Sequence, residues 1–106
     1  METNQSKILD KIKSIVQAVE PTAQVMLYGS RSRGTSTSDS DWDILILVDK
    51  PTITPKEEQA ITYPLYDLEF DIGEIINPVV YTQSDWNTKY KITPFYRNVM
   101  QEAVSL

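Results

Sequence analysis

The 106-residue sequence contains no cysteine and no histidine. The absence of both residue types excludes disulfide bonds, thiolate nucleophiles, structural zinc sites of the usual kind and imidazole bases. Any catalysis by this chain therefore has to rely on carboxylates, hydroxyl groups and basic side chains.

Long apolar runs and an excess of positive charge are missing as well. No run approaches the ~18 apolar residues needed to cross a bilayer, and residues 1–13 contain no apolar signal-peptide core, so the expected location is cytoplasmic, away from any membrane. The net charge of -5 argues against a duplex DNA partner, because neutralising phosphates takes clustered lysine and arginine. The length predicts one domain over residues 1–106.

Hydrophobic spacing predicts an alternation of helices and strands. Apolar residues at helical spacing predict a helix over residues 5–19. Short apolar runs predict strands over 23–28, 41–48 and 74–82. With a short helix after the first strand, the expected order is α, β, short α, β, α, β, α, α. We therefore expect an α/β (α+β) fold in which helices pack on a small mixed sheet of three to five strands.

Proline and capping residues indicate where the long middle helix begins and ends. Thr54 and Glu57 form a capping box, with Pro55 at the first helical position. Pro64 lacks the amide hydrogen that a helix interior uses, so we expect it to kink or split this helix before Gly73.

The last third of the chain contains further markers of the same kind. Pro78 should remove one ladder hydrogen bond from the third strand and favours an edge position or a bulge. Ser84 and the pair Thr93-Pro94 predict two further helix starts, and the last helix should extend to Ala103.

The segment YGSRSRGTSTSDSDWDILIL, residues 28–47, combines two features that suggest a binding site. Asp41 and Asp43 are two apart in a strand, so both side chains point to one face. Two adjacent carboxylates are tolerable where a divalent cation bridges them, and magnesium takes carboxylate and phosphate oxygens. Gly29-Ser30 lies where a strand ends and a helix can begin, so its amides and hydroxyl can hold a phosphate.

The same residues resemble the motif of the minimal nucleotidyltransferases in the DNA polymerase beta superfamily. That motif is an apolar residue, Gly, Gly or Ser, a gap of about nine to thirteen residues, and then Asp, apolar, Asp or Glu, apolar. Tyr28-Gly29-Ser30, ten intervening residues and Asp41-Trp42-Asp43-Ile44 match it. The intervening loop, with Arg31, Arg33 and Gly34, is also similar to the loop of that family.

The resemblance implies a palm-like fold and a particular reaction. A magnesium-dependent enzyme of this kind moves a nucleoside monophosphate from a triphosphate, expected to be ATP, to a hydroxyl on a protein side chain or a small molecule. Asp41 and Asp43 would hold Mg²⁺ and act in catalysis. The nucleotide would be bound by four residues of the turn and loop: Gly29, Ser30, Arg31 and Arg33.

Active members of the family carry a third acid on the third strand, which binds metal and accepts a proton. Here that strand reads EIINPVVYT, and the residue nearest the expected position is Asn77, which cannot act as a base. Strand alternation places Asn77 and Glu74 on opposite faces. Glu74 could still supply the third catalytic acid through a bulge near Pro78, Asp71 could supply it from the helix end, or the site could lack it.

Three functions therefore remain open at this level. The first is the transferase, and the second is a catalytically weak, antitoxin-like binding module that acts on a protein partner. The third is an α/β domain with no nucleotide role. We expect a partner chain or a homo-oligomer, because the strand ends alone form a shallow cleft that cannot enclose an acceptor.

Overall fold

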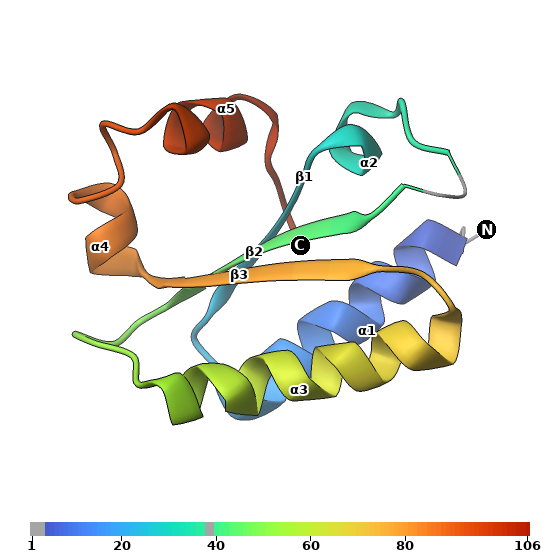
Figure 1. The fold of residues 1–106 in the computed structure, drawn as a ribbon, viewed down its shortest axis with the longest axis horizontal. Coiled ribbons are helices and arrows are strands. Elements are labelled where there is room, and N and C mark those ends of the chain that lie inside the picture. Colours follow the sequence, from blue (N-terminus) through green and yellow to red (C-terminus); the bar gives the residue numbers. More distant parts are fainter. Residues whose placement is uncertain (1–3, 38–39) are drawn as a thin grey trace.

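Helices and strands alternate along the chain largely as the sequence predicts. In a computed structural model the described residues are 4–37 and 40–106, so the first three residues of the predicted domain and residues 38–39 of the loop lie outside them. The elements of the fold (Figure 1) are α1 (Asn4–Val19), β1 (Gln24–Tyr28), α2 (Ser30–Arg33), β2 (Trp42–Val48), α3 (Pro55–Ile72), β3 (Ile76–Thr82), α4 (Gln83–Asn87), α5 (Pro94–Glu102) and β4 (Val104–Ser105).

The strands form one mixed sheet in the order β3-β2-β1-β4, which confirms the predicted fold class. β1 is antiparallel to β2 and β4, and β2 is parallel to β3. The end of β1 therefore meets the beginnings of β2 and β3 at one end of the sheet. In this register Tyr28 lies opposite Asp43 on one side, and Asn77 lies opposite Asp43 on the other.

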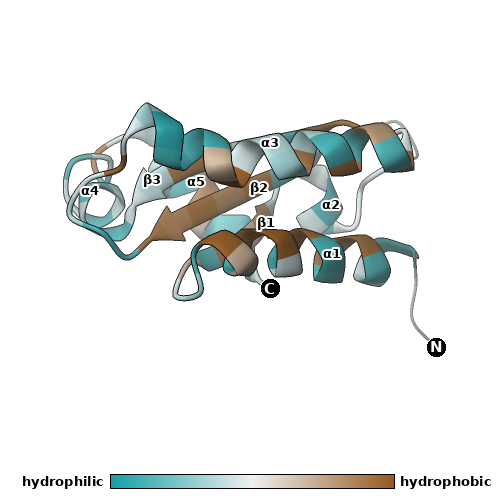
Figure 2. Ribbon diagram, turned by 90° about the horizontal axis from the view of Figure 1, so that it is seen from below, coloured by the Kyte–Doolittle hydropathy of each residue, from teal (hydrophilic) through white to brown (hydrophobic). Residues whose placement is uncertain are grey.

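The two faces of the sheet are covered by different helices. α1 and α3 lie on one face, whereas α4 and α5 lie on the other (Figure 1). β2 is hydrophobic along most of its length (Figure 2) because it packs against both layers. Its Ile44 and Ile46 join the core under α1 and α3, while Leu45 and Leu47 join a smaller core with Trp86 of α4. Each such buried side chain contributes about 1.5–3 kcal/mol of burial free energy.

α3 begins with the predicted capping box. The hydroxyl of Thr54 accepts a hydrogen bond from the Glu57 amide at 3.2 Å, and the Glu57 carboxylate accepts one from the Thr54 amide at 3.1 Å. Pro64 does not split the helix, which continues to Ile72. Proline removes one backbone hydrogen bond, but the buried neighbours Ile61 and Leu65 hold the turns on both sides against the sheet.

Two element boundaries between residues 73 and 88 differ from the prediction. β3 begins at Ile76 rather than at residue 74, because Gly73 ends α3 in the left-handed conformation (φ 69°) and two residues link it to the strand. α4 begins after Thr82, whose hydroxyl accepts from the Asp85 amide at 3.0 Å, and not at Ser84. β3 is an edge strand, as the proline within it indicates.

The C-terminal residues form a strand that the sequence does not predict. α5 starts at Pro94 as expected, but it ends at Glu102, and Ala103 is extended (φ -65°, ψ 138°). Val104 and Ser105 then pair with β1. A two-residue strand leaves no hydrophobic pattern in the sequence, because its formation depends on an edge that other elements create. In the described parts of the chain, no helix combines the length and apolar character that a membrane span needs.

Candidate nucleotide-binding site

The turn after β1 lies directly against one of the paired acids. Gly29 has φ 79°, a conformation that favours glycine. A Cβ atom on Gly29 would also lie only 2.3 Å from Oδ2 of Asp43. The backbone angle therefore favours glycine, and any larger residue would also force the Asp43 carboxylate to move. Ser30 follows as the first residue of the short helix α2.

Asp41 and Asp43 share the sheet end with Asn77. The Asn77 side-chain amide donates to Oδ2 of Asp41 at 2.9 Å and to Oδ1 of Asp43 at 3.3 Å. Burial raises the pKa of Asp43, the neighbouring charges of Asp41 and Glu102 raise it further, and the Asn77 hydrogen bond opposes the shift. The two carboxylates therefore carry closely spaced negative charge, which a neutral amide only partly offsets.

These three side chains are suited to a hard cation. Carboxylate oxygens and amide carbonyls are common oxygen ligands of magnesium and calcium, and rotation of the Asn77 amide would present its carbonyl oxygen to an ion. Across residues 4–37 and 40–106, no group of three or more acidic residues is arranged to hold a metal. The candidate set here is accordingly two carboxylates and one amide.

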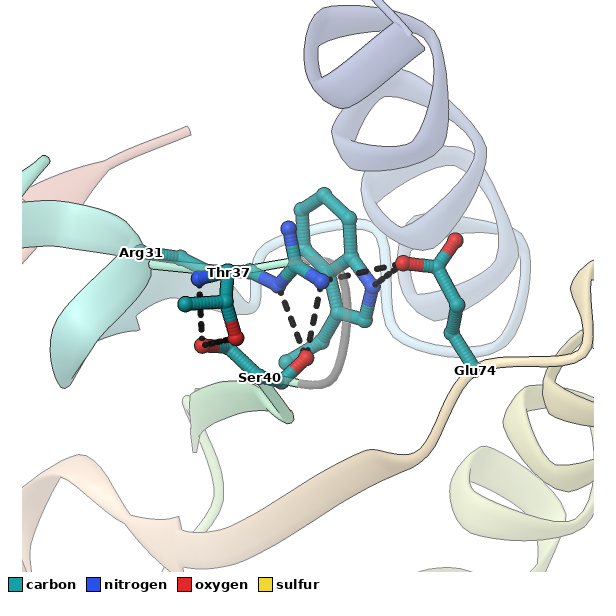
Figure 3. A network of polar contacts seen from close by, with 5 residues as sticks. Arg31, Thr37, Ser40 and Glu74 are labelled. Atoms are coloured by element: carbon teal, nitrogen blue, oxygen red, sulfur yellow. Dashed lines mark hydrogen bonds and ion pairs between the residues drawn. The ribbon is translucent and has the colours of Figure 1, made fainter. Parts of the chain in front are cut away.

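Arg31 lies on the other side of the start of β2, in the polar network of Figure 3. Its guanidinium donates to the Ser40 carbonyl at 2.7 and 3.1 Å and pairs with the Glu74 carboxylate at 2.9 Å. It also stacks on the Trp42 ring, 3.9 Å from the centroid. Trp42 donates to the same Glu74 oxygen at 3.4 Å. With only 8% of its side chain exposed, Arg31 fastens the loop to the sheet.

Arg33 is oriented differently from Arg31 and meets the end of α5. Its guanidinium contacts Oε2 of Glu102 at 2.5 Å, while Oε1 of Glu102 accepts from the Gly29 amide at 3.0 Å. The hydrogen bond from the Arg33 guanidinium is the main reason that the pKa of Glu102 is lowered, and the hydrogen bond from the Gly29 amide and the Arg33 charge lower it further. The turn that the sequence assigns to phosphate binding is therefore in contact with a carboxylate from the far end of the chain.

Aromatic rings of β1, α4 and α5 pack beside this site. Tyr28 and Trp86 both meet the Phe95 ring edge to face, at centroid distances of 5.7 and 5.8 Å. Burial, and then the charge of Asp43, raise the pKa of Tyr28 to about 12. The Tyr28 hydroxyl consequently stays protonated at neutral pH. Edge-to-face rings and burial of this kind stabilise the layer that carries Glu102.

The structure divides the sequence-predicted site residues into two groups. Five of them lie together at the open sheet end: Gly29, Ser30, Arg33, Asp41 and Asp43. Arg31 and Glu74 form the second group, with their charged ends paired to each other and to Trp42. Asp71 lies in the last turn of α3 and is exposed.

Glu102 was not singled out from the sequence. It lies 73 positions after Gly29, so no local motif connects the two residues. A weak signal exists in the helical period, because Glu102 is three residues after the buried Val99 and therefore near the inward face of α5. A carboxylate at such a position is uncommon and invites a search for its partner.

Comparisons with known proteins concern the family and the fold of the chain. Residues 6–104 match the family model described as "Nucleotidyltransferase domain". A curated relative, "Putative protein adenylyltransferase MJ0141" of Methanocaldococcus jannaschii, is 37% identical over 62 residues. That match covers 58% of this chain and 61% of the relative, so it spans less than two thirds of that protein.

Two solved structures have the same fold. One is a chain of a toxin-antitoxin crystallised with AMP-PNP, with a TM-score of 0.65 and 18% identity over 91% of this chain and 69% of that one. The other is a chain of a mutant of the toxin-antitoxin MntA-HpeT, with a TM-score of 0.64 and 20% identity over 99% and 72% of the two chains. At these identities the likeness concerns the fold.

Proposed function

The chain belongs to the nucleotidyltransferase domain family, and on that premise we propose that it binds a magnesium-nucleoside triphosphate and transfers the nucleoside monophosphate to a hydroxyl acceptor. Asp41 and Asp43 would hold Mg²⁺, and Gly29, Ser30 and Arg33 would bind the phosphates. The observation that carries the proposal is the contact between the Gly29 turn and the Asp43 carboxylate. This contact brings the turn that would bind phosphate next to an acid that would bind the cation.

The residues of the chain have distinct tasks in this proposal. Bound magnesium would neutralise the triphosphate and polarise the phosphate that is attacked. The Gly29 and Ser30 amides can donate to phosphate oxygens because a chain entering a helix leaves such groups without helical partners. Arg33, with half of its side chain exposed, can reach a phosphate from the end of α2. Arg31 would act indirectly by fixing the loop between Gly29 and Asp41.

The proposed identities of the acceptor and the nucleotide rest on the names of the similar proteins. The relative from Methanocaldococcus jannaschii is named as a protein adenylyltransferase, and one structural neighbour was crystallised with AMP-PNP. Both favour ATP as donor, and the name of the relative favours a protein hydroxyl as acceptor, with a small molecule as the other candidate. The toxin-antitoxin neighbours favour a protein partner. A cytoplasmic setting would supply both ATP and magnesium.

Asn77 favours a second candidate function. It lies beside Asp43 on β3 and is the residue nearest to where the resemblance predicts the third acid, and an amide cannot accept a proton from an attacking hydroxyl. Glu74 could act as that acid only after leaving Arg31 and Trp42, with which it is paired. The alternative is therefore a nucleotide-binding, antitoxin-like module with weak transfer, which acts through its protein partner.

A transfer assay separates these functions. The protein would be purified with any chain that accompanies it and incubated with magnesium and ATP labelled at the α-phosphate. Label should pass to a protein or small-molecule acceptor, and the Asp41→Asn, Asp43→Asn double variant should abolish the transfer. Magnesium-dependent ATP binding without transfer would support the binding module. Neither binding nor transfer by the folded protein would refute both functions.

The expected partner can be tested independently. The site lies at one end of the sheet, whereas two concavities elsewhere on the described surface, of about 290 and 310 Å³, are lined mainly by α1. An acceptor would accordingly need another chain to cover the acids. Light scattering combined with purification from native cells should give a complex or an oligomer. A strict monomer with no accompanying protein would contradict this part of the proposal.

A further inference from the structure

The end of α5 places a carboxylate on the groups that would bind phosphate. Glu102 accepts from the Gly29 amide through one oxygen and contacts Arg33 through the other. A backbone amide and a guanidinium are typical phosphate ligands. The Glu102 side chain is 21% exposed.

We propose that Glu102 is a built-in competitor of the triphosphate: it occupies the anion-binding groups of the turn in the nucleotide-free protein and has to withdraw when nucleotide binds. This inference rests on the proposed nucleotide site at Gly29. It goes further by assigning Glu102 the control of access to that site. No bond is made or broken, because the exchange replaces one anion by another on the same donors.

The charges around Glu102 favour exchange over simultaneous binding. Gly29 has one amide hydrogen, so a phosphate oxygen and the Glu102 carboxylate cannot both take it at full strength. Asp41 and Asp43 already place negative charge nearby, and the Glu102 charge is one of the causes that raise the pKa of Asp43. Adding a triphosphate beside Glu102 would increase this repulsion, whereas withdrawal of Glu102 would release Arg33 for the phosphates.

The backbone next to Glu102 is fixed, so the exchange needs only the side chain to move. The Ala103 amide donates to the Val99 carbonyl at 2.8 Å, and Leu106 donates to the Val25 carbonyl at 2.9 Å. Between them, β4 pairs with β1. These hydrogen bonds keep the end of α5 beside the turn in either state. Rotation of the Glu102 side chain, which takes far less than a microsecond when exposed, can then open the donors.

Calorimetry with a magnesium-bound, non-hydrolysable ATP analogue tests the inference. Glu102→Gln keeps the size of the side chain but removes its charge, so affinity should rise roughly 3- to 10-fold as a partly exposed charge contact is lost. The matched control is Glu58→Gln, which removes the same charge from the exposed N-terminal turn of α3, at the opposite end of the sheet. The control should retain wild-type affinity. A gain in affinity cannot result from a damaged fold.

The outcomes also separate this inference from the proposed function. If the wild type binds the analogue and the Asp41→Asn, Asp43→Asn variant does not, the nucleotide site stands. Equal or weaker binding by Glu102→Gln would then overturn the competitor role alone, and so would an equal gain in Glu58→Gln. If neither the wild type nor Glu102→Gln binds the analogue, both the site and the competitor role fail. Chemical-shift changes at the Gly29 amide on adding nucleotide would supply a second readout of the exchange.

Discussion

The carboxylates on the two sides of the start of β2 differ in their hydrogen-bond partners. On one side, Glu74 is paired with Arg31, and the guanidinium is stacked on the Trp42 ring. On the other side, Asp41 and Asp43 share the neutral amide of Asn77. The two sides are built from neighbouring residues, because Trp42 and Asp43 alternate along β2 and point to opposite faces.

This difference distinguishes a stabilising cluster from a binding site. A carboxylate that is paired and hydrogen-bonded by arginine stabilises the folded state, whereas two carboxylates brought together without a cation destabilise it. Local destabilisation of that kind is common where a ligand supplies the missing charge. The side with Asp41 and Asp43 is therefore the better candidate for the binding site. The side with Arg31 and Glu74 holds the adjoining loop in place.

The largest expected effect is the loss of stability when Arg31 is replaced. Arg31→Ala would leave the Glu74 carboxylate and the Ser40 carbonyl without their donor and expose the Trp42 face. We expect a loss of about 2–3 kcal/mol in unfolding free energy, which lowers Tm by roughly 10–20 °C. Urea and thermal unfolding would measure both quantities.

Arg33→Ala provides the matched comparison for that variant. Arg33 is 51% exposed, so the ion pair that it forms contributes less than about 1 kcal/mol. Equal stability of Arg31→Ala and Arg33→Ala would contradict the role of Arg31 in holding this loop against the sheet.

A smaller effect is expected from completing the acid set. Asn77→Asp would place a third carboxylate beside Asp41 and Asp43, and three carboxylates bind magnesium more tightly than two. We expect magnesium affinity to rise roughly 10-fold, with a modest fall in the stability of the metal-free protein. If transfer is limited by the missing base, turnover should rise as well. Magnesium titration and the labelled transfer assay would detect these changes, and unchanged affinity would place Asn77 outside the metal shell.

The smallest effect concerns the pH dependence of stability. The pKa of Asp43 is raised above 3.8 in the folded protein, so the folded state binds this proton more tightly than the unfolded state. Stability is then lost as pH rises from the unfolded pKa through the folded one. Asp43→Asn should therefore raise Tm by a few degrees at pH 7, and the gain should vanish near pH 3.

Asp49→Asn is the control for this experiment, because Asp49 is exposed at the opposite end of β2. Thermal unfolding across the pH range would give the comparison. A loss of stability in Asp43→Asn at pH 7 would show that the ionised Asp43 carboxylate contributes to the fold and is not a strained site residue.

Much of the fold could be predicted because its signals are local. The period of α1, the apolar runs of β1 and β2, and the capping box of α3 each depend on residues within a few positions of one another. Of the two outcomes expected at Pro64, a kink or a split, the split was wrong because tertiary packing holds the helix together on both sides of the proline. β4 was missed since two residues carry no periodic pattern.

The site could be predicted only in part, for a related reason. Gly29, Asp41 and Asp43 belong to one short motif, and the structure brings them together. The partners of Glu74 and Glu102 depend on contacts with residues 43 and 73 positions away. Sequence spacing could place Glu74 and Asn77 on opposite faces. It could not reveal that an arginine was already paired with Glu74.

The central claim is that the side with Asp41 and Asp43 binds nucleotide, whereas the side with Arg31 and Glu74 stabilises the fold. Its most direct test compares wild type, the Asp41→Asn, Asp43→Asn double variant and Glu74→Gln by two methods: binding of the ATP analogue with magnesium, and thermal unfolding. The double variant should lose ~10²-fold or more in affinity and keep or raise its Tm. Glu74→Gln should bind within about twofold of wild type and lose roughly 5 °C in Tm. The reverse pattern, with nucleotide binding or transfer lost in Glu74→Gln and retained in the double variant, would contradict the assignment of the two sides.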